Sequence, residues 1–130
     1  MGDIYAAINV GRAYLKDGEY DKSVKLFDYL STKIGITHDV YYKVLANRAY
    51  AFIGAGKFRE AVTQLEQVRS IKGGNNFLAW HSIALAYAHF RLGENEKYKE
   101  WLEFSRNANG FRGNERFFRG LYPEIKDDLR

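Results

Sequence analysis

The chain has 130 residues, the length of one domain, and it is expected to form a single domain over 1–130. Hydrophobic residues make up 46% and charged residues 28%, which is ordinary globular usage and excludes a disordered, solvated polymer. The absence of cysteine excludes disulfides and thiolate metal sites, and a net charge of +4 is too small to indicate a nucleic-acid binder. No membrane span and no signal peptide are expected, and the expected location is the cytoplasm.

A single proline, Pro123, leaves most of the chain free to form helices, which favours an all-α fold. Three glycine turns divide the chain at Gly18, Gly56 and Gly93, which are 38 and 37 residues apart. The residue types around the turns repeat at five offsets. A small residue comes seven positions before each glycine and a ring four before it, at Gly11, Ala49, Ala86 and at Tyr14, Phe52, His89. After the glycines, the offsets of five, nine and twelve give Ser23, Ala61, Tyr98, then Phe27, Leu65, Leu102, then Leu30, Val68, Ser105.

This pattern predicts three helical hairpins in chain order, at about 4–35, 39–72 and 76–109. A lone hairpin cannot bury both of its apolar faces, so the hairpins are expected to stack on one another. In the two connectors, Thr37, Asp39, Asn75 and Asn76 are candidates for the residue that caps the next helix.

The segment 114–130 is predicted to form a capping helix over the last hairpin. Phe117, Phe118, Leu121 and Ile125 follow helical spacing, and Pro123 should end the helix near Leu121 and leave a short turn after it. The adjacent phenylalanines have two interpretations, which are sealing of the core and an exposed docking patch.

The small residue, the ring, the glycine turn and the small residue that follows it resemble the tetratricopeptide repeat over residues 4 to about 110. The resemblance implies an all-α superhelix of three hairpins with a C-terminal capping helix, although the spacing exceeds the family's period of about 34 residues. The third hairpin departs from the family at Tyr98, where alanine is preferred, and at Asn95, where the turn aromatic is missing. That hairpin is therefore expected to pack differently.

Catalytic motifs are not supported by the sequence. Gly54-Ala55-Gly56-Lys57 lacks the first glycine and the hydroxyl residue of a phosphate-binding loop. The three histidines, His38, His81 and His89, lack metal-ligand spacing and are interpreted as packed or capped side chains. No cofactor, no metal and no enzymatic activity are expected.

In tetratricopeptide repeats the first helix of each hairpin lines a concave groove, and the resemblance implies which residues do so here. The candidate groove residues are Tyr5, Arg12, Lys16, Lys43, Asn47, Tyr50, Trp80, Tyr87 and Arg91. Tyrosine, tryptophan and arginine are enriched at binding hot spots, and the mixture of rings and cations suits a peptide or partner helix with acidic and apolar residues. The alternative interpretation is that about half of these rings only bridge neighbouring helices.

The leading hypothesis is thus a non-catalytic interaction module that acts as a scaffold, adaptor or chaperone-like subunit. Capture of a chaperone's C-terminal tail is not expected, because Ile8, Arg12, Trp80 and Ala84 depart from the residues that the family uses for it. Two alternatives stay open, namely a repeat domain appended to a larger enzyme or regulator and a helical-repeat RNA binder. Nucleic acid is not the expected partner, and a homodimer is left open.

Overall fold

The computed structural model describes residues 2–35, 39–73 and 76–130. The chain folds into two compact units, Met1–Ile71 and Lys72–Arg130, and each is described here by itself. The described residues form helices and no strand, so the expected all-α arrangement of consecutive hairpins is confirmed.

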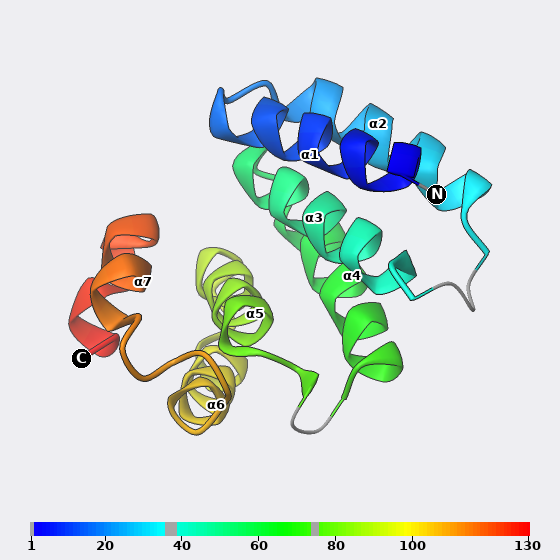
Figure 1. Cartoon of the computed structure of the whole chain (residues 1–130). Helices are drawn as coiled ribbons and strands as arrows, with labels where there is room; N and C mark the ends of the chain where they lie inside the picture. Colours follow the sequence, from blue (N-terminus) through cyan, green and yellow to red (C-terminus); the bar gives the residue numbers. More distant parts are fainter. Residues whose placement is uncertain (1, 36–38, 74–75) are drawn as a thin grey trace. The chain divides into compact units, whose positions relative to one another are not determined.

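Unit 1 consists of the first two hairpins (Figure 1). Its helices are α1 (Gly2–Lys16), α2 (Tyr20–Lys33), α3 (Tyr41–Gly54) and α4 (Phe58–Ile71). Helix α3 packs against α1, α2 and α4, so the second hairpin lies on the first. The core of the unit includes Phe27, Val44, Leu65 and Val68, which are fully buried.

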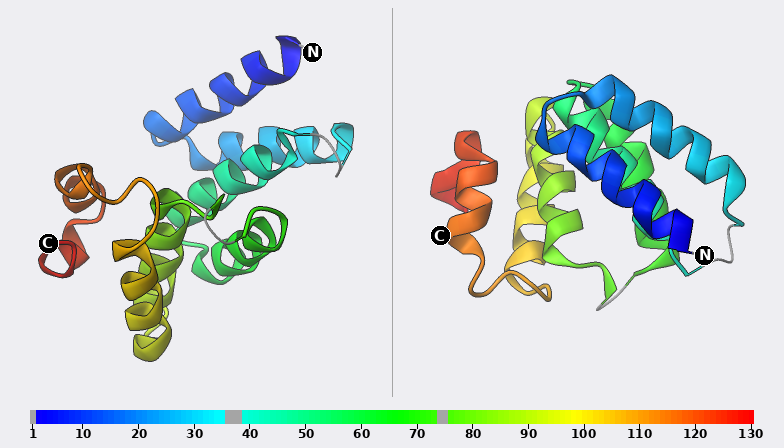
Figure 2. Two further views of the ribbon diagram at one scale, coloured as in Figure 1. Left: turned by 60° about the horizontal axis from the view of Figure 1, so that its bottom comes forward. Right: turned by 45° about the horizontal axis from the view of Figure 1, so that its top comes forward.

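Unit 2 consists of the third hairpin and the C-terminal segment. Its helices are α5 (Ala79–Arg91), α6 (Asn95–Arg106), α7 (Glu115–Leu121) and the 3₁₀ helix η2 (Pro123–Asp128). The break between Leu121 and Pro123 agrees with the expected effect of the proline. Both views in Figure 2 show α7 beside the third hairpin.

The three glycine turns have the same backbone geometry. Gly18, Gly56 and Gly93 have φ angles of 78°, 78° and 75°, the left-handed region that glycine enters without steric cost. In each turn the amide after the glycine donates to the carbonyl five residues earlier, and these bonds are Glu19 to Tyr14, Lys57 to Phe52 and Glu94 to His89. Each hairpin therefore turns through a Schellman motif, in which these bonds satisfy carbonyls at the end of the first helix.

The first two hairpins contain the small residues that the sequence pattern requires at the helix crossing. Gly11 meets the ring of Phe27, and the buried hydroxyl of Ser23 donates to the Gly11 carbonyl across 2.9 Å. In the second hairpin Ala49 and Ala61 are fully buried at the corresponding positions. The small side chains let the two helix backbones approach closely.

Tyr98 occupies the corresponding slot in the third hairpin, and its side chain reaches beyond the hairpin. Its ring lies 5.1 Å from that of Phe90, and its hydroxyl donates to Asp128 Oδ2 at 2.6 Å. Arg106 also donates to the backbone carbonyl of Asp128. The larger residue thus ties the C-terminal segment to α6.

The expected capping residues Asp39 and Asn76 are wrong. The residues directly before helices α3 and α5 are Val40 and Leu78. Neither Val40 nor Leu78 forms a side-chain hydrogen bond that caps the helix. The first amide of α5, that of Ala79, instead donates to the carbonyl of Asn109 at 2.9 Å. A backbone carbonyl from the loop after α6 therefore replaces a polar side chain at this helix start. The other candidates, Thr37 and Asn75, lie outside the described residues.

Candidate protein-binding surface

One face of unit 1 collects six of the predicted groove residues together with Asn9. We call this set the α1–α3 strip: Tyr5, Asn9, Arg12 and Lys16 on α1, and Lys43, Asn47 and Tyr50 on α3. Positions three and four residues apart lie on one side of a helix. Because Tyr5 and Lys43, Asn9 and Asn47, and Arg12 and Tyr50 are each 38 residues apart, equivalent sides of two packed helices contribute to the strip.

The α1–α3 strip faces solvent and carries positive charge. The side chain of Tyr5 is 48% exposed, and those of Arg12, Lys16 and Lys43 are also exposed. Within the described residues the charged side-chain groups of these three cations form no hydrogen bond or ion pair. Asn47 and Tyr50 are half-buried, and the Asn47 amide donates to the Lys43 carbonyl at 2.8 Å. The strip thus combines two tyrosines, two amides and three cations, and it contains no carboxylate.

In unit 2 the equivalent side of α5 contacts the chain's own C-terminal segment. Trp80 packs edge-on against Phe117 and Phe118, with ring centroids 4.8 and 5.0 Å away. Tyr87 is buried against the ring of Tyr122 at 4.8 Å. The structure therefore brings Trp80, Tyr87 and Arg91 together with α7 and η2, and their assignment to a partner surface stays a prediction.

Glu124 of η2 is the polar centre of this contact. The Tyr87 hydroxyl donates to Glu124 Oε1 at 2.5 Å, and Arg91 Nη1 lies 3.2 Å from Glu124 Oε2. Arg91 Nη1 also donates to the Tyr87 hydroxyl at 2.9 Å. Burial, and then the hydrogen bond to Glu124, raise the pKa of Tyr87. This side of α5 thus holds a carboxylate through a tyrosine hydroxyl and an arginine.

The adjacent phenylalanines Phe117 and Phe118 differ in burial, and each fits one of the two interpretations, an exposed patch or sealing of the core. Phe118 is fully buried and seals the core of unit 2, whereas the side chain of Phe117 is 50% exposed. Phe117 and Leu121, which is 51% exposed, lie four residues apart on α7. One member of the pair is therefore structural and the other presents an apolar surface to solvent.

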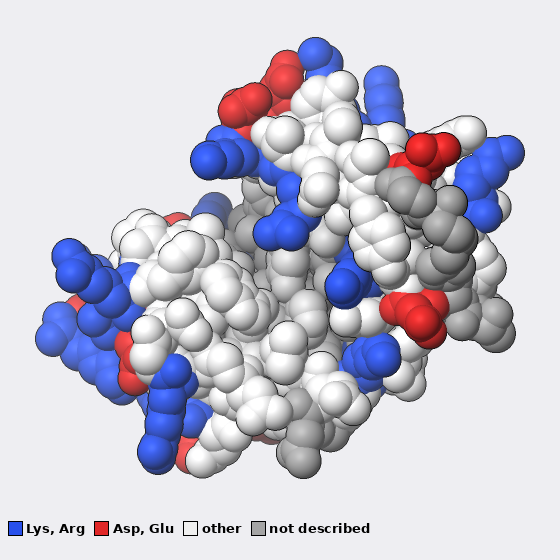
Figure 3. Space-filling model, viewed as in Figure 1, with Lys and Arg blue, Asp and Glu red and all other residues white. Residues whose placement is uncertain are grey.

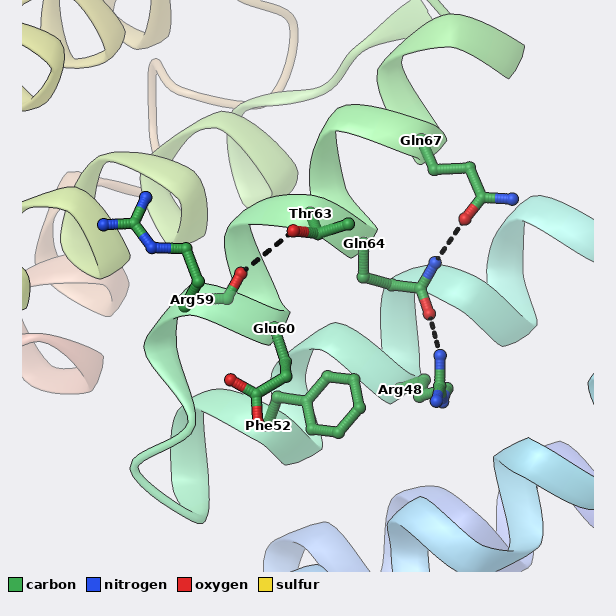
Figure 4. A pocket seen from close by; sticks show the side chains of 7 residues that line it. All are labelled: Arg48, Phe52, Arg59, Glu60, Thr63, Gln64 and Gln67. Carbon is green, nitrogen blue, oxygen red and sulfur yellow. Dashed lines mark hydrogen bonds between the residues drawn. The ribbon is translucent and has the colours of Figure 1, made fainter.

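The structure also contains a pocket, lined mostly by residues with polar side chains, that sequence reasoning missed. An open pocket of about 250 Å³ lies between α3 and α4 in unit 1 (Figure 4), and its lining residues include Arg48, Phe52, Arg59, Gln64 and Gln67. Arg48 Nη1 donates to Gln64 Oε1, and the Gln64 amide donates to Gln67 Oε1. These side chains form one wall of the pocket.

Arg48 itself serves the packing of unit 1. Its guanidinium is paired with Asp28 of α2 and lies 4.7 Å from the ring centroid of Phe52. Together with the bond to Gln64, these contacts join α2, α3 and α4. A sequence signal was available, because Arg48 interrupts the apolar stripe formed by Val44 and Ala51.

The histidines that the structure describes are packed or paired. His81 is buried beside Phe77, and burial lowers the pKa of its imidazole to about 4. His89 fills its ring slot, and its Nδ1 lies 2.8 Å from Glu94 Oε1. The remaining histidine, His38, lies outside the described residues. Across the described part of the chain, no three His, Asp or Glu side chains are grouped so that they could hold a metal ion.

Consecutive helical hairpins, whose helices are joined by turns of one geometry, define this chain as a helical-hairpin repeat protein. No family model matches its sequence. The chain is similar to the human protein named Intraflagellar transport protein 88 homolog, with 27% identity over 94 residues. That match covers 72% of this chain and 11% of the human protein. None of the helices in the described ranges is both long and apolar enough to cross a bilayer.

Proposed function

We propose that the chain is a non-catalytic, tetratricopeptide-like interaction module whose α1–α3 strip binds an acidic peptide or partner helix. The observation that carries this proposal is the composition of the strip, which places Arg12, Lys16 and Lys43 beside two tyrosines with no carboxylate among them. Cations without a protein partner attract acidic ligands, and tyrosine adds contact area at small entropic cost.

Unit 2 supplies a precedent for the chemistry of the ligand. By the register of the hairpins, Tyr87 corresponds to Arg12 and Tyr50, and Arg91 corresponds to Lys16. Tyr87 and Arg91 bind the Glu124 carboxylate. Tyr122, which is two residues before Glu124 in the sequence, packs on the ring of Tyr87. We therefore expect the partner of the α1–α3 strip to present a carboxylate close in sequence to an aromatic or large apolar residue.

The binding energy is expected to concentrate at Arg12 and Tyr50. Arg12 is exposed and can form a two-pronged contact with a carboxylate, whereas Tyr50 is half-buried and offers a ring that is already held in place. Removal of a hot-spot side chain of these types costs about 2 kcal/mol or more of binding free energy. The exposed cations should also make the affinity fall as salt rises.

The experiment is selection of peptides from a random library displayed on phage, using the full chain as bait. We expect the wild-type chain to enrich peptides that carry acidic residues next to aromatic ones. The double variant Arg12→Ala/Tyr50→Ala should lose this enrichment, while the control Lys25→Ala, which removes an exposed cation from α2, should keep it. Unchanged enrichment on the double variant, with its helical circular dichroism intact, would show that the strip is not the binding surface.

The likeness to a protein named for intraflagellar transport supports a scaffold or adaptor role within this proposal. The chain spans about a ninth of that protein's length, so a module that acts inside a larger protein or assembly is part of the same proposal. A cytoplasmic location and the absence of catalysis also belong to the proposal.

A further inference from the structure

A pocket within unit 2 combines aromatic rings with carboxylates. Its volume is about 420 Å³, which is large enough for one side chain of a partner. The segment before α5 contributes Phe77, the C-terminal half of α6 contributes Glu100, Glu103 and Phe104, and the first residues after α6 complete the lining. No Lys or Arg is among the lining residues. The function proposed above leaves this pocket without a role.

Two phenylalanine rings form the apolar part of the pocket lining. Phe77 is buried, and its ring centroid lies 5.9 Å from that of the half-buried Phe104, with the two planes at 63°. Trp101 packs edge-on against both rings, at 5.6 Å from Phe77 and 5.3 Å from Phe104. The ring of Phe104 is therefore held in place before a ligand binds, so little conformational freedom is lost on binding. Aromatic rings attract cations that lie over their faces.

The two carboxylates of the pocket are exposed and lie on one side of α6. Glu100 and Glu103 are three residues apart, and their side chains are 66% and 71% exposed. Glu100 lies 3.7 Å from Lys97 and Glu103 lies 3.0 Å from Arg106, both within the same helix. Exposed ion pairs at this spacing contribute little free energy, so a cation on a ligand can compete for both carboxylates.

The position of the pocket strengthens its preference for positive charge. It includes Asn107, the residue at the C-terminal end of α6, and this end of a helix carries partial negative charge. The Lys and Arg side chains of unit 2 gather instead on the side where α7 lies, as Figure 3 shows. Two carboxylates, a helix C-terminus and a lining without cations together favour a positively charged ligand.

The equivalent part of the second hairpin lacks these groups. The register of the turns at Gly56 and Gly93 places Thr63 and Gln67 of α4 at the positions of Glu100 and Phe104. Neither Thr63 nor Gln67 supplies a ring or a charge. The ring and the pair of carboxylates are thus specific to the third hairpin, and the repeat itself does not require them.

We propose that this pocket binds an arginine side chain of a protein partner. The guanidinium group is planar, so it can stack on the ring of Phe104 and donate paired hydrogen bonds to a carboxylate. The apolar stem of the arginine side chain suits the rest of the ring surface. The pocket lies in unit 2 and takes a basic group, whereas the α1–α3 strip lies in unit 1 and takes an acidic one. This inference therefore does not depend on the proposed peptide binding.

The test is an NMR titration of the full chain with acetyl-arginine amide through the millimolar range, where binding of a single side chain is expected. Acetyl-citrulline amide is the matched ligand, because it has nearly the same shape without the charge. Glu103→Gln removes one carboxylate from an exposed position, so the fold is kept, and Phe104→Leu removes the ring. Glu66→Gln is the control variant, because Glu66 is the exposed residue of α4 that is equivalent to Glu103.

We expect acetyl-arginine amide to shift the amide signals of Phe77 and of residues 100–109 until they saturate, and acetyl-citrulline amide to bind more weakly. Glu103→Gln and Phe104→Leu should each weaken the affinity about threefold, the size expected for one exposed charge pair or one cation–π contact. Glu66→Gln should bind like the wild type. Equal affinity for the two ligands, shifts confined to other parts of the chain, or wild-type affinity in Glu103→Gln would overturn the proposal.

Discussion

The ring of Phe27 occupies the space that a side chain on residue 11 would need. A Cβ atom placed on Gly11 would lie 2.4 Å from Phe27 Cζ, far inside van der Waals contact. Phe27 is fully buried, and Ser23 one turn earlier on α2 donates to the Gly11 carbonyl. Helices α1 and α2 therefore meet with the backbone of one against the side chains of the other.

The Gly11→Ala substitution tests this contact. Alanine favours a helix interior over glycine by about 1 kcal/mol, but an extra methyl group in a packed core costs about 1–3 kcal/mol. We expect a net loss of stability of about 1 kcal/mol, measured by urea unfolding. Gly120→Ala is the control, because no atom lies within 4 Å of the added methyl group in α7. Gly120→Ala should stabilise the chain. If Gly11→Ala stabilises it as well, the result would contradict the close approach of α1 and α2 at Gly11.

The turn glycines give a second prediction with a different physical origin. A Cβ on Gly56 would meet no atom within 4 Å, so a substitution there changes only the backbone energy at a φ of 78°. Gly56→Ala should lower the free energy of unfolding by about 1 kcal/mol, and Gly56→Asn should lower it less, because asparagine tolerates left-handed geometry. Urea unfolding of both variants gives the comparison. Equal losses for alanine and asparagine would contradict a backbone origin.

The buried hydroxyls of Ser82 and Ser105 should be energetically coupled. Their oxygens are 2.7 Å apart, and each hydroxyl also lies near a backbone carbonyl, that of Ala79 for Ser82 and that of Trp101 for Ser105. Each single alanine variant should lose about 1 kcal/mol, because the remaining buried hydroxyl loses the other hydroxyl as a partner and keeps only the backbone carbonyl. The double variant should lose less than the sum of the two, which a double-mutant cycle of unfolding free energies measures. Additive losses would show that the two hydroxyls do not interact.

His81 predicts a loss of stability in mild acid. Burial lowers its pKa from 6.5 to about 4, so the imidazole stays neutral in the folded chain while it gains a proton in the unfolded chain. As pH falls from 6.5 towards 4, the unfolded state therefore binds more protons, and stability should decrease by about 1.4 kcal/mol per pH unit. The measurement is the urea midpoint of the wild-type chain and of His81→Gln across this range. The variant should show the shallower decline, and parallel curves would contradict a buried neutral His81.

Local sequence was sufficient to predict the hairpins. The positions of Gly18, Gly56 and Gly93 fix three turns of one geometry, and Pro123 fixes the end of α7, because both effects operate within a few residues. Asp39 was wrong as a cap because α3 begins only after Val40. Asn76 was wrong because α5 begins only after Leu78, and its first amide donates to the carbonyl of Asn109, thirty residues later in the chain. Such long-range replacement of a local signal is not visible in a sequence window.

For the candidate binding surface, the sequence could predict which residues share one side of a helix. Helical spacing placed Tyr5, Arg12 and Lys16 on one exposed side of α1, because this property depends on the helix period alone. The same spacing could not reveal that Glu124 occupies the side of Tyr87 and Arg91, since that contact requires the C-terminal segment to fold back on α5. Arg48 was missed for a related reason, because its partner Asp28 lies on another hairpin.

The hairpin turns carry a consequence for cooperativity. In each turn the residue after the glycine bonds to both helices. The amide of Glu19, for example, donates to the Tyr14 carbonyl at the end of α1, and the Glu19 carbonyl accepts from the Ser23 amide in the first turn of α2. Fraying of either helix at the turn therefore moves a residue that also bonds to the other helix. The smallest part of the chain that opens independently is therefore expected to be a pair of helices. Amides on both sides of a turn should then exchange with solvent deuterium at closely matched rates, whereas the opposite helix ends exchange faster.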